Sequence, residues 1–392
     1  MATAWLLVLS VLLPAGAAAT AASASTLSSA ERAFMPASSA TRRASFLAPA
    51  TAAGWQNEHR QQRRLEQVST IRTRARRCSA AMSALASESE LAGVTGGVED
   101  RTWKWRGYDI RYKVAGEGTE GPPMVLIHGF GGNADHWRKN LPNLGKTGPA
   151  YAIDLLGYGF SSKPDPGSWE ERNNIYSFDT WSQQVRDFAN EVVGKPVFLV
   201  CNSVGGVAGL QAGVDAPKEV LGVVLFNISL RMLHTKKQAA AARPFVTALQ
   251  YVLRETALGP LFFGSVAKPE ALSKIPLSKA WGPGAHGSWV QASPKPGALG
   301  TGGFKVFLDF ISYSGGPLPE DLLKVIKVPV VIGWGVEDPW EPIEQGRAYA
   351  DYDSVEDFID LPGAGHCPQD EAPHLTDPIV LDFVNKHYKS IA

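Results

Sequence analysis

Short runs of apolar residues, many of them β-branched, alternate along this chain with segments in which apolar residues recur every three to four positions. The short runs predict buried strands, and the periodic segments predict amphipathic helices. The runs that predict strands are 124–127, 150–154, 197–201, 220–227, 328–334 and 356–361. The segments that predict helices lie near 135–144, 178–193, 204–216, 341–351 and 374–388. This alternation is typical of an α/β fold, with a mostly parallel, twisted sheet and helices on both of its faces.

The segment before the first of these runs has a different pattern. Residues 102–114 alternate bulky apolar and polar side chains and are interrupted at Gly107. Because alternation indicates half-buried strands, we expect an antiparallel hairpin that turns at Gly107 and opens the sheet. When the two strands of this hairpin are counted, the run at 220–227 is the sixth strand of the chain.

About a hundred residues separate the strand that ends at Asn227 from the strand that begins at Val328, many more than a crossover requires. We therefore expect a cap insertion after the sixth strand, at residues 231–317. It would divide the core into a first part, 100–230, and a second part, 318–392.

The composition of this cap changes along its length. Apolar and aromatic residues are frequent in 239–266, which predicts helices that either line a pocket or pack onto the core. Residues 275–303 are instead rich in Gly and Pro, and we expect them to be poorly ordered.

The first 80 residues contain ten Arg, three Glu and neither Lys nor Asp, among many Ala, Ser and Thr. An Arg-rich, Ser-rich and acid-poor composition is typical of an organellar transit peptide, so residues 1–80 are predicted to be a disordered presequence. Residues 71–82 resemble a stromal processing region, which favours the chloroplast. The alternative is the secretory pathway, because residues 5–13 form a short apolar run like that of a signal peptide.

Charge and cysteine content exclude some functions. Without its first 80 residues the chain has 28 Lys and Arg against 35 Asp and Glu, so a basic surface for nucleic acid is not supported. Beyond Cys78 only two cysteines remain, Cys201 and Cys367, which cannot form a disulfide framework. No P-loop, dinucleotide fingerprint or metal-ligand spacing occurs, so no cofactor and no metal are expected.

The strand at 197–201 ends in the sequence Cys-Asn-Ser203-Val-Gly-Gly, and a helical pattern follows at once. A strand, a sharp turn and a helix in this order form a nucleophile elbow, which lifts a serine hydroxyl above the end of a parallel sheet. Small residues are needed there because the turn is strained and the helix packs close to the strand. Ser203 is therefore the candidate nucleophile.

Acyl transfer through a serine also needs two N–H donors aimed at the oxyanion of the tetrahedral intermediate. The strand at 124–127 runs into the glycine-rich loop His-Gly-Phe130-Gly-Gly. This loop can supply the backbone N–H of Phe130, and the elbow can supply that of Val204. We expect these two groups to form the oxyanion hole; the alternative is that the glycines only turn the chain.

A histidine base and an orienting acid complete such a site, and in this architecture they follow the serine in the order acid, histidine. Asp338 follows the strand at 328–334, and His366 lies in a glycine-flanked loop after the strand at 356–361. Both loops are predicted at the same end of the sheet as Ser203.

Other acids compete for the orienting role. Glu337 and Glu341 follow the same strand as Asp338, which is favoured because its shorter side chain before Pro339 is easier to hold fixed. Some proteins of this architecture place the acid after the preceding strand, but that position is Asn227, which cannot carry the charge.

These motifs carry a resemblance to a known family. The matching segments are VLIHGFGGNADHW, AIDLLGYGFSSKP, the elbow, WGVEDPWEP and GAGHCPQDEAP. The chain resembles α/β-hydrolases of the plastid branch that contains chlorophyll dephytylases, with pheophytinases as more distant relatives, over roughly residues 100–235 and 304–390. A serine at the elbow differs from the carboxylate nucleophile of haloalkane dehalogenases and epoxide hydrolases. Within the pattern, Asp154 is expected to stabilise a loop.

The resemblance implies the α/β-hydrolase fold and a serine hydrolase that cleaves a carboxylic ester. Its triad would be Ser203, Asp338 and His366, with Phe130 and Val204 as the oxyanion hole. The implied substrate is a hydrophobic small-molecule ester, in this branch the phytyl ester of a chlorophyll-type tetrapyrrole. Such a substrate is compatible with peripheral membrane association, and the sequence leaves the oligomeric state open.

Three other functions fit the same residues. A carbon–carbon bond hydrolase uses the same triad. A strigolactone-type receptor retains the triad but turns over slowly. The unusual cap composition is also compatible with an inactive ligand-binding protein.

Overall fold

The computed structural model describes residues 97–389 except 172, 233 and 267–302. The predicted presequence, residues 1–80, lies outside the described residues. So does the Gly/Pro-rich segment predicted at 275–303, apart from Gly303, which begins a helix.

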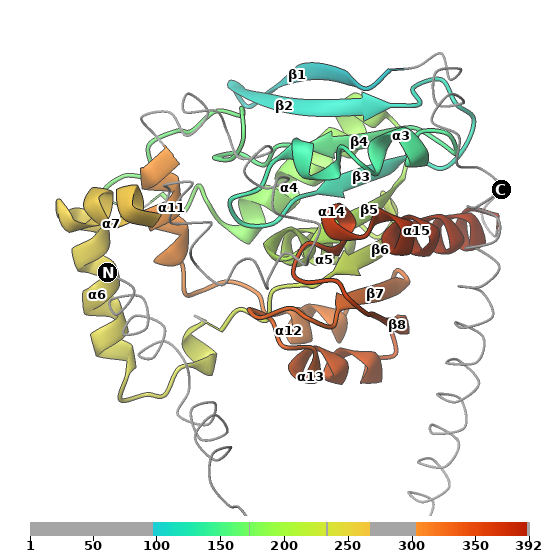
Figure 1. The fold of residues 1–392 in the computed structure, drawn as a ribbon. Coiled ribbons are helices and arrows are strands. Elements are labelled where there is room, and N and C mark those ends of the chain that lie inside the picture. The colour runs from blue at the N-terminus through green and yellow to red at the C-terminus, as the bar shows by residue number, and fades with distance from the viewer. Residues whose placement is uncertain (1–96, 172, 233, 267–302, 390–392) are drawn as a thin grey trace, which may run out of the picture. The chain divides into compact units, whose positions relative to one another are not determined.

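The described residues form one eight-stranded sheet, as the sequence pattern predicts (Figure 1). Its strand order is β1-β2-β4-β3-β5-β6-β7-β8. The antiparallel pairs are β1 with β2 and β2 with β4, and every later pair is parallel. The strands are β1 (Glu99–Trp105), β2 (Tyr108–Ala115), β3 (Met124–Ile127), β4 (Ala150–Ile153), β5 (Val197–Asn202), β6 (Val220–Phe226), β7 (Val330–Gly335) and β8 (Val355–Leu361). The predicted α/β fold with a mostly parallel sheet is confirmed.

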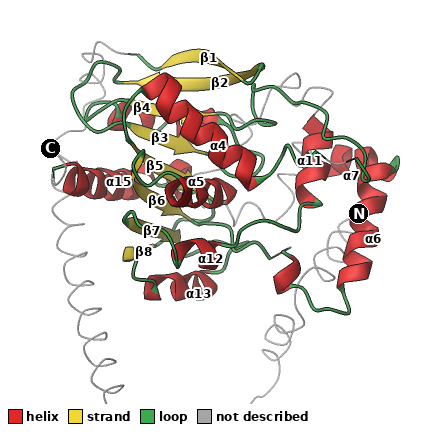
Figure 2. Ribbon diagram, turned by 180° about the vertical axis from the view of Figure 1, so that it is seen from behind, coloured by secondary structure: helices red, strands yellow, loops and turns green. Residues whose placement is uncertain are grey.

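Side chains of the sheet alternate between two hydrophobic cores, one on each face. In β5, Leu199 and Cys201 belong to one core, and Phe198 and Val200 belong to the other. The face that holds Leu199 is covered by α4 (Phe178–Phe188), α5 (Val204–Asp215) and α12 (Pro319–Leu323), as Figure 2 shows. The opposite face is covered by α3 (Leu141–Leu144) and α15 (Pro373–Tyr388). Strands buried on both faces explain the continuous apolar runs of the sequence.

Two predicted helices are broken into shorter elements. The segment predicted near 135–144 forms the 3₁₀ turn η2 (Ala134–Trp137) and then α3, because Pro142 lacks the N–H that a continuous helix would need. The segment near 341–351 forms α13 (Ile343–Gly346) and the 3₁₀ turn η5 (Arg347–Asp351).

Other predicted helices keep their positions but change in detail. The segment at 178–193 forms α4 followed by a π-helical turn, η3 (Ala189–Val193). The short helix α14 (Pro368–Glu371) was not predicted, because four residues are too few to show a helical period. None of the described helices is long and apolar enough to cross a bilayer.

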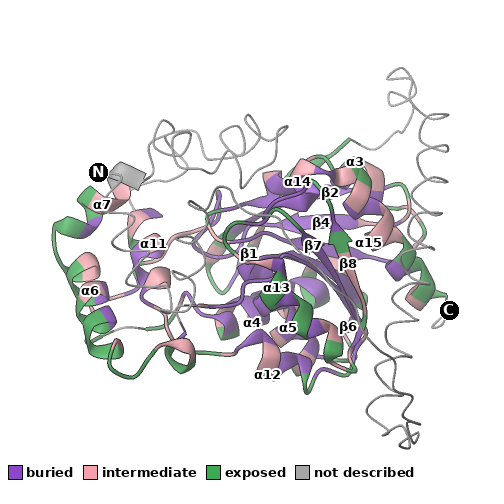
Figure 3. Ribbon diagram, turned by 60° about the horizontal axis from the view of Figure 1, so that its bottom comes forward, coloured by how far each residue is buried: buried purple, intermediate pink, exposed green. Residues whose placement is uncertain are grey.

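The chain between β6 and β7 contains η4 (Thr235–Lys237), α6 (Arg243–Glu255), α7 (Leu258–Val266) and α11 (Gly303–Ile311). Arg254 of α6 pairs with the buried carboxylate of Asp309 on α11 at 3.0 Å, which joins these two helices. It also donates to the carbonyl of Gly167 at 2.8 Å, in the loop before α4. Figure 3 shows the sheet interior buried and parts of α6 and α7 exposed. Exposed apolar side chains on these two helices include Phe245, Leu258 and Leu261.

Candidate active site

Ser203 lies in the turn between β5 and α5, at the carboxyl end of a central strand. Its backbone has φ 55° and ψ −124°, a conformation that residues other than glycine rarely adopt. The helix starts at once, and a Cβ on Gly205 would lie 2.4 Å from the carbonyl oxygen of His128. The requirement for a small residue therefore follows from the close approach of α5 to the end of β3, and the turn has the geometry of a nucleophile elbow.

The side chains of Ser203, His366 and Asp338 form one hydrogen-bonded row. Ser203 Oγ is 3.0 Å from His366 Nε2, and His366 Nδ1 is 2.7 Å from Asp338 Oδ2. All three residues are buried, with 5%, 5% and 6% of their surfaces exposed. The structure thus brings together three residues from separate loops, in the order that proton transfer from the hydroxyl to the imidazole requires.

The charges around His366 favour its protonated form. Burial by itself lowers the pKa of His366, but the carboxylates of Asp338, Glu341 and Glu371 outweigh it, and the pKa lies above the ordinary value of 6.5. Burial also opposes ionisation of Asp338, but the charge and hydrogen bond of His366 dominate and lower the pKa of that carboxyl. Asp338 is therefore charged at neutral pH and can stabilise an imidazolium.

The two glutamates that compete with Asp338 in the sequence differ from it in burial and in hydrogen bonding. Glu337 is exposed. Glu341 is buried and accepts a hydrogen bond from Ser229 Oγ at 3.0 Å, and burial raises its pKa to about 7. Asp338, and neither glutamate, is the hydrogen-bond partner of His366 Nδ1.

Asn227, at the alternative acid position after β6, orients Asp338 instead of replacing it. Its Nδ2 donates to Asp338 Oδ2 at 2.7 Å, and its Oδ1 accepts from the N–H of Gly335 at 2.9 Å. The other oxygen, Asp338 Oδ1, accepts from the N–H groups of Trp340 and Glu341 at 2.8 and 3.0 Å. Four hydrogen bonds, including that from His366, therefore fix the orientation of the Asp338 carboxylate.

The loop after β3 passes directly beside the elbow. A Cβ on Gly129 would lie 2.8 Å from the Cβ of Ser203, so the next residue, Phe130, adjoins the serine. Val204 is the first residue of α5, where backbone N–H groups have no partner within the helix. The backbone N–H groups of Phe130 and Val204 therefore lie in positions suited to the two donors of an oxyanion hole.

Two polar residues that hold this loop lie at the ends of β3 and β4. His128 Nδ1 donates to the carbonyl of Gly129 at 2.7 Å, and its Nε2 accepts from the N–H of Leu155 at 3.1 Å. These partners require the Nδ1–H tautomer, and burial lowers the pKa of His128 to about 3, so the ring stays neutral. Asp154 accepts from the N–H groups of Ala134 and Phe160 at 2.6 and 2.7 Å, a loop-stabilising role like the one expected.

Asn202 joins the elbow to the histidine loop, a contact that the sequence does not reveal. Its Nδ2 donates to the backbone carbonyl of His366 at 3.0 Å and to that of Phe226 at 3.1 Å. The only signal in the sequence is its place next to Ser203, because its partner His366 is 164 positions away along the chain.

Thiol and metal chemistry have little support at this site. Cys201 and Cys367 are both buried, and burial raises the pKa of each thiol far above its usual range. They are therefore unreactive and fill space. Within the described part of the chain, no group of three His, Cys, Asp or Glu residues is arranged to hold a metal ion.

Aromatic side chains extend from the site toward the segment between β6 and β7. The ring of Phe130 lies 5.3 Å from that of Phe307 on α11, which lies 5.2 Å from that of Phe263 on α7. On the other side, the ring of Trp340 is 5.1 Å from the imidazole of His366. Aromatic rings thus adjoin both Phe130 and His366, which suits a hydrophobic ligand.

Known proteins share both sequence and fold with this chain. The alpha/beta hydrolase family matches residues 124–377. A chloroplastic pheophytinase from Arabidopsis thaliana is 25% identical over 72% of this chain and 65% of its own length, so this chain spans less than two thirds of that relative. A human (lyso)-N-acylphosphatidylethanolamine lipase is 24% identical over 69% of this chain and 81% of the lipase.

Solved structures show the same fold. An alpha/beta hydrolase fold protein from Burkholderia ambifaria aligns with a TM-score of 0.56 and 24% identity, over 73% of this chain and 99% of the other. A serine hydrolase involved in carbazole degradation aligns with a TM-score of 0.55 and 20% identity, over 74% and 100% of the two chains. At these identities the likeness concerns the fold, which is that of known hydrolases.

Proposed function

The chain belongs to the alpha/beta hydrolase family, and on this premise we propose that it hydrolyses carboxylic esters with Ser203 as nucleophile, His366 as base and Asp338 as orienting acid. The observation that carries the proposal is the hydrogen-bonded row in which Ser203 Oγ meets His366 Nε2 at 3.0 Å and His366 Nδ1 meets Asp338 at 2.7 Å. Hydrolases among its relatives, including a pheophytinase and a lipase, support the reaction class.

The first half of the reaction forms an acyl-enzyme. Ser203 Oγ attacks the ester carbonyl carbon while His366 Nε2 takes the hydroxyl proton, and the negative charge of Asp338 stabilises the imidazolium. The carbonyl oxygen becomes an oxyanion that the N–H groups of Phe130 and Val204 bind. His366 then gives its proton to the departing alcohol as the carbon–oxygen bond breaks.

The second half repeats these steps with water. His366 takes a proton from water, whose oxygen attacks the acyl carbon, and the second oxyanion occupies the same site. When this intermediate collapses, the proton returns to Ser203 Oγ and the carboxylic acid is released. The protein, the ester and water supply every atom and proton that these two half-reactions need.

For the substrate we propose a hydrophobic ester, and within this class the phytyl ester of a chlorophyll-type tetrapyrrole. The aromatic series from Phe130 through Phe307 to Phe263 supports a hydrophobic ligand. The relation to a pheophytinase supports the phytyl ester, and because that relative is chloroplastic it also supports a chloroplast location. Peripheral association with a membrane surface would give access to such a lipid-like substrate.

The test of the substrate uses the purified full-length protein with chlorophyll or pheophytin in detergent, and measures phytol by mass spectrometry. A phosphatidylethanolamine and a short p-nitrophenyl ester serve as comparison substrates. Release of phytol from either tetrapyrrole supports the proposal. Hydrolysis of the short ester without release of phytol would overturn the phytyl ester while leaving ester hydrolysis in place.

Two further ligands, a diketone and a small butenolide, distinguish the other functions that are compatible with the triad. A carbon–carbon bond hydrolase would cleave a diketone faster than a simple ester. A receptor would show a thermal shift with small butenolides and little turnover, and an inactive binding protein would turn over neither class.

The pH dependence of ester hydrolysis should follow His366. Since the base must be neutral and its pKa lies above 6.5, kcat/KM should rise with pH and reach half its maximum above the ordinary pKa of histidine. The measurement is kcat/KM for a short ester from about pH 5 to about pH 9, corrected for hydrolysis in buffer alone. An acid limb at or below the ordinary value would contradict the electrostatic environment described for His366.

A further inference from the structure

Glu371 binds the backbone on both sides of His366. Its Oε2 accepts from the N–H of Gly365 at 2.7 Å, and its Oε1 accepts from the N–H of Cys367 at 2.9 Å. The carbonyl of His366 between them accepts from Asn202. We propose that Glu371 is a positioning residue that holds the loop of His366 so that the imidazole stays aligned with the serine. This inference rests on the proposed function of His366 as base.

The two hydrogen bonds of the Glu371 carboxylate hold the backbone more firmly than the hydrogen bond of an ordinary turn. A carboxylate that accepts two N–H groups forms charge-assisted hydrogen bonds, which are about twice as strong as neutral ones. The two donors flank one residue, so the bonds restrict the backbone dihedrals of His366 itself. A simple helix cap for α14 would need only the bond to Cys367, and the second bond to Gly365 reaches back across His366.

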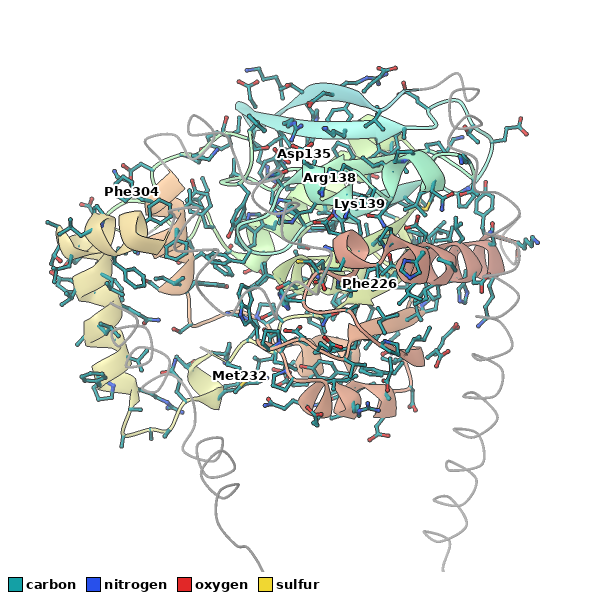
Figure 4. The ribbon with its side chains drawn as sticks, in the orientation of Figure 1. Asp135, Arg138, Lys139, Phe226, Met232 and Phe304 are labelled. Carbon is teal, nitrogen blue, oxygen red and sulfur yellow. The ribbon has the colours of Figure 1, made fainter. Side chains whose placement is uncertain are left out.

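Helix α14, which carries Glu371, is itself held in place. The neighbouring Asp370 has a buried side chain that pairs with Arg138 at 2.9 Å and with Lys139 at 3.1 Å. Arg138 and Lys139, labelled in Figure 4, follow the turn η2 and lie close to α14. Glu371 therefore projects from a fixed support, as a positioning residue must.

The charge of Glu371 also acts on His366. The ionisable groups that face the imidazole are Asp338, Glu341 and Glu371, and each raises the pKa of His366. Burial raises the pKa of Glu371 to about 7, while its two N–H donors lower it. Above a pH of about 7 the Glu371 carboxylate is ionised, and its negative charge then favours the imidazolium of His366.

Two substitutions separate positioning from simple stability. In Glu371→Gln the amide group must face one of the two N–H donors, so at least one hydrogen bond is lost. We expect kcat for a short ester to fall by about 10- to 100-fold with KM changed by less than about twofold. Removing the negative charge should also move the acid limb of the pH profile to lower pH. Glu371→Asp keeps the charge, so it should lose part of kcat but keep the acid limb of the wild type.

The matched control is Glu337→Gln, the same change at an exposed position beside Asp338, which should leave kcat, KM and the acid limb unchanged. Thermal midpoints are measured for all variants, and kinetics are compared well below them. A purely structural role for Glu371 would lower the midpoint without moving the acid limb. That result, or a kcat within about twofold of wild type in Glu371→Gln, would overturn the proposal.

Nuclear magnetic resonance gives a readout that does not depend on turnover. In Glu371→Gln at least one of the amides of Gly365 and Cys367 should exchange with solvent faster than in the wild type, and the imidazole of His366 should titrate at lower pH. Unchanged exchange and titration would overturn the proposal about Glu371. Wild-type protein that hydrolyses no ester would refute the proposed function instead, and the exchange and titration would still decide the role of Glu371.

Discussion

Ser203→Ala should reduce ester hydrolysis by about 10⁴- to 10⁶-fold, because it removes the atom that forms the acyl bond. The neighbouring geometry should persist, since alanine occupies the same volume less one oxygen. The thermal midpoint is therefore expected to stay close to that of the wild type. Activity is measured with a p-nitrophenyl ester, and covalent labelling with a fluorophosphonate probe, which phosphonylates only an activated serine hydroxyl.

A second serine provides the matched control. Ser354 precedes β8 at the end of the sheet away from Ser203, and its hydroxyl donates to the carbonyl of Leu323 at 2.8 Å. Ser354→Ala should retain hydrolysis and labelling even if its midpoint falls. Labelling of Ser203→Ala at the rate of the wild type would show that a different residue is the nucleophile and would refute the proposed mechanism.

The parts of the fold that the sequence predicts well are those with continuous patterns. The strand β5 is apolar at every position but its last because α5 covers one face and α15 covers the other. The continuous apolar run therefore identifies it as a buried strand. Strand β1 of the hairpin shows period-two alternation because its residues alternate between exposed and partly buried positions. Elements of four or five residues such as α12 and α14 carry no complete period, and they are fixed by tertiary contacts instead.

The residues of the candidate site also fall into two groups, those that the sequence predicts and those that it does not. Ser203, Asp338 and His366 were predictable because each follows a strand of a parallel sheet, and the carboxyl ends of such strands meet at one edge. The residues that hold these three were not predictable. Asn202 and Asn227 act through contacts between loops that are distant in the sequence, and Glu371 acts through backbone N–H groups of the folded histidine loop. Nothing in the sequence distinguishes such an asparagine or glutamate from an ordinary residue of a turn.

The largest effect after loss of the nucleophile is expected from Asp338→Asn. The oxygen at Oδ1 must stay where it accepts from the N–H groups of Trp340 and Glu341. The introduced NH₂ then occupies the place of Oδ2, where it faces two donors, His366 Nδ1–H and Asn227 Nδ2. His366 can relieve this only by moving its proton to Nε2, the nitrogen that must accept from Ser203. We expect kcat to fall about 10⁴-fold, the cost of the wrong tautomer in a serine protease.

Adding Asn227→Asp to this variant should restore part of the loss. Asn227 already lies 2.7 Å from the oxygen that binds His366, and aspartate tolerates its left-handed backbone, φ 44°. The double variant therefore returns one carboxylate to the vicinity of His366 from the neighbouring strand, where its charge again stabilises the imidazolium. We expect at least about a tenfold gain in kcat over Asp338→Asn alone. Asn227→Asp by itself should instead lose stability, because it sets two carboxylates in contact. The four proteins form a double-mutant cycle in kcat and thermal midpoint. If the double variant is no faster than Asp338→Asn, His366 needs its acid from the β7 loop alone.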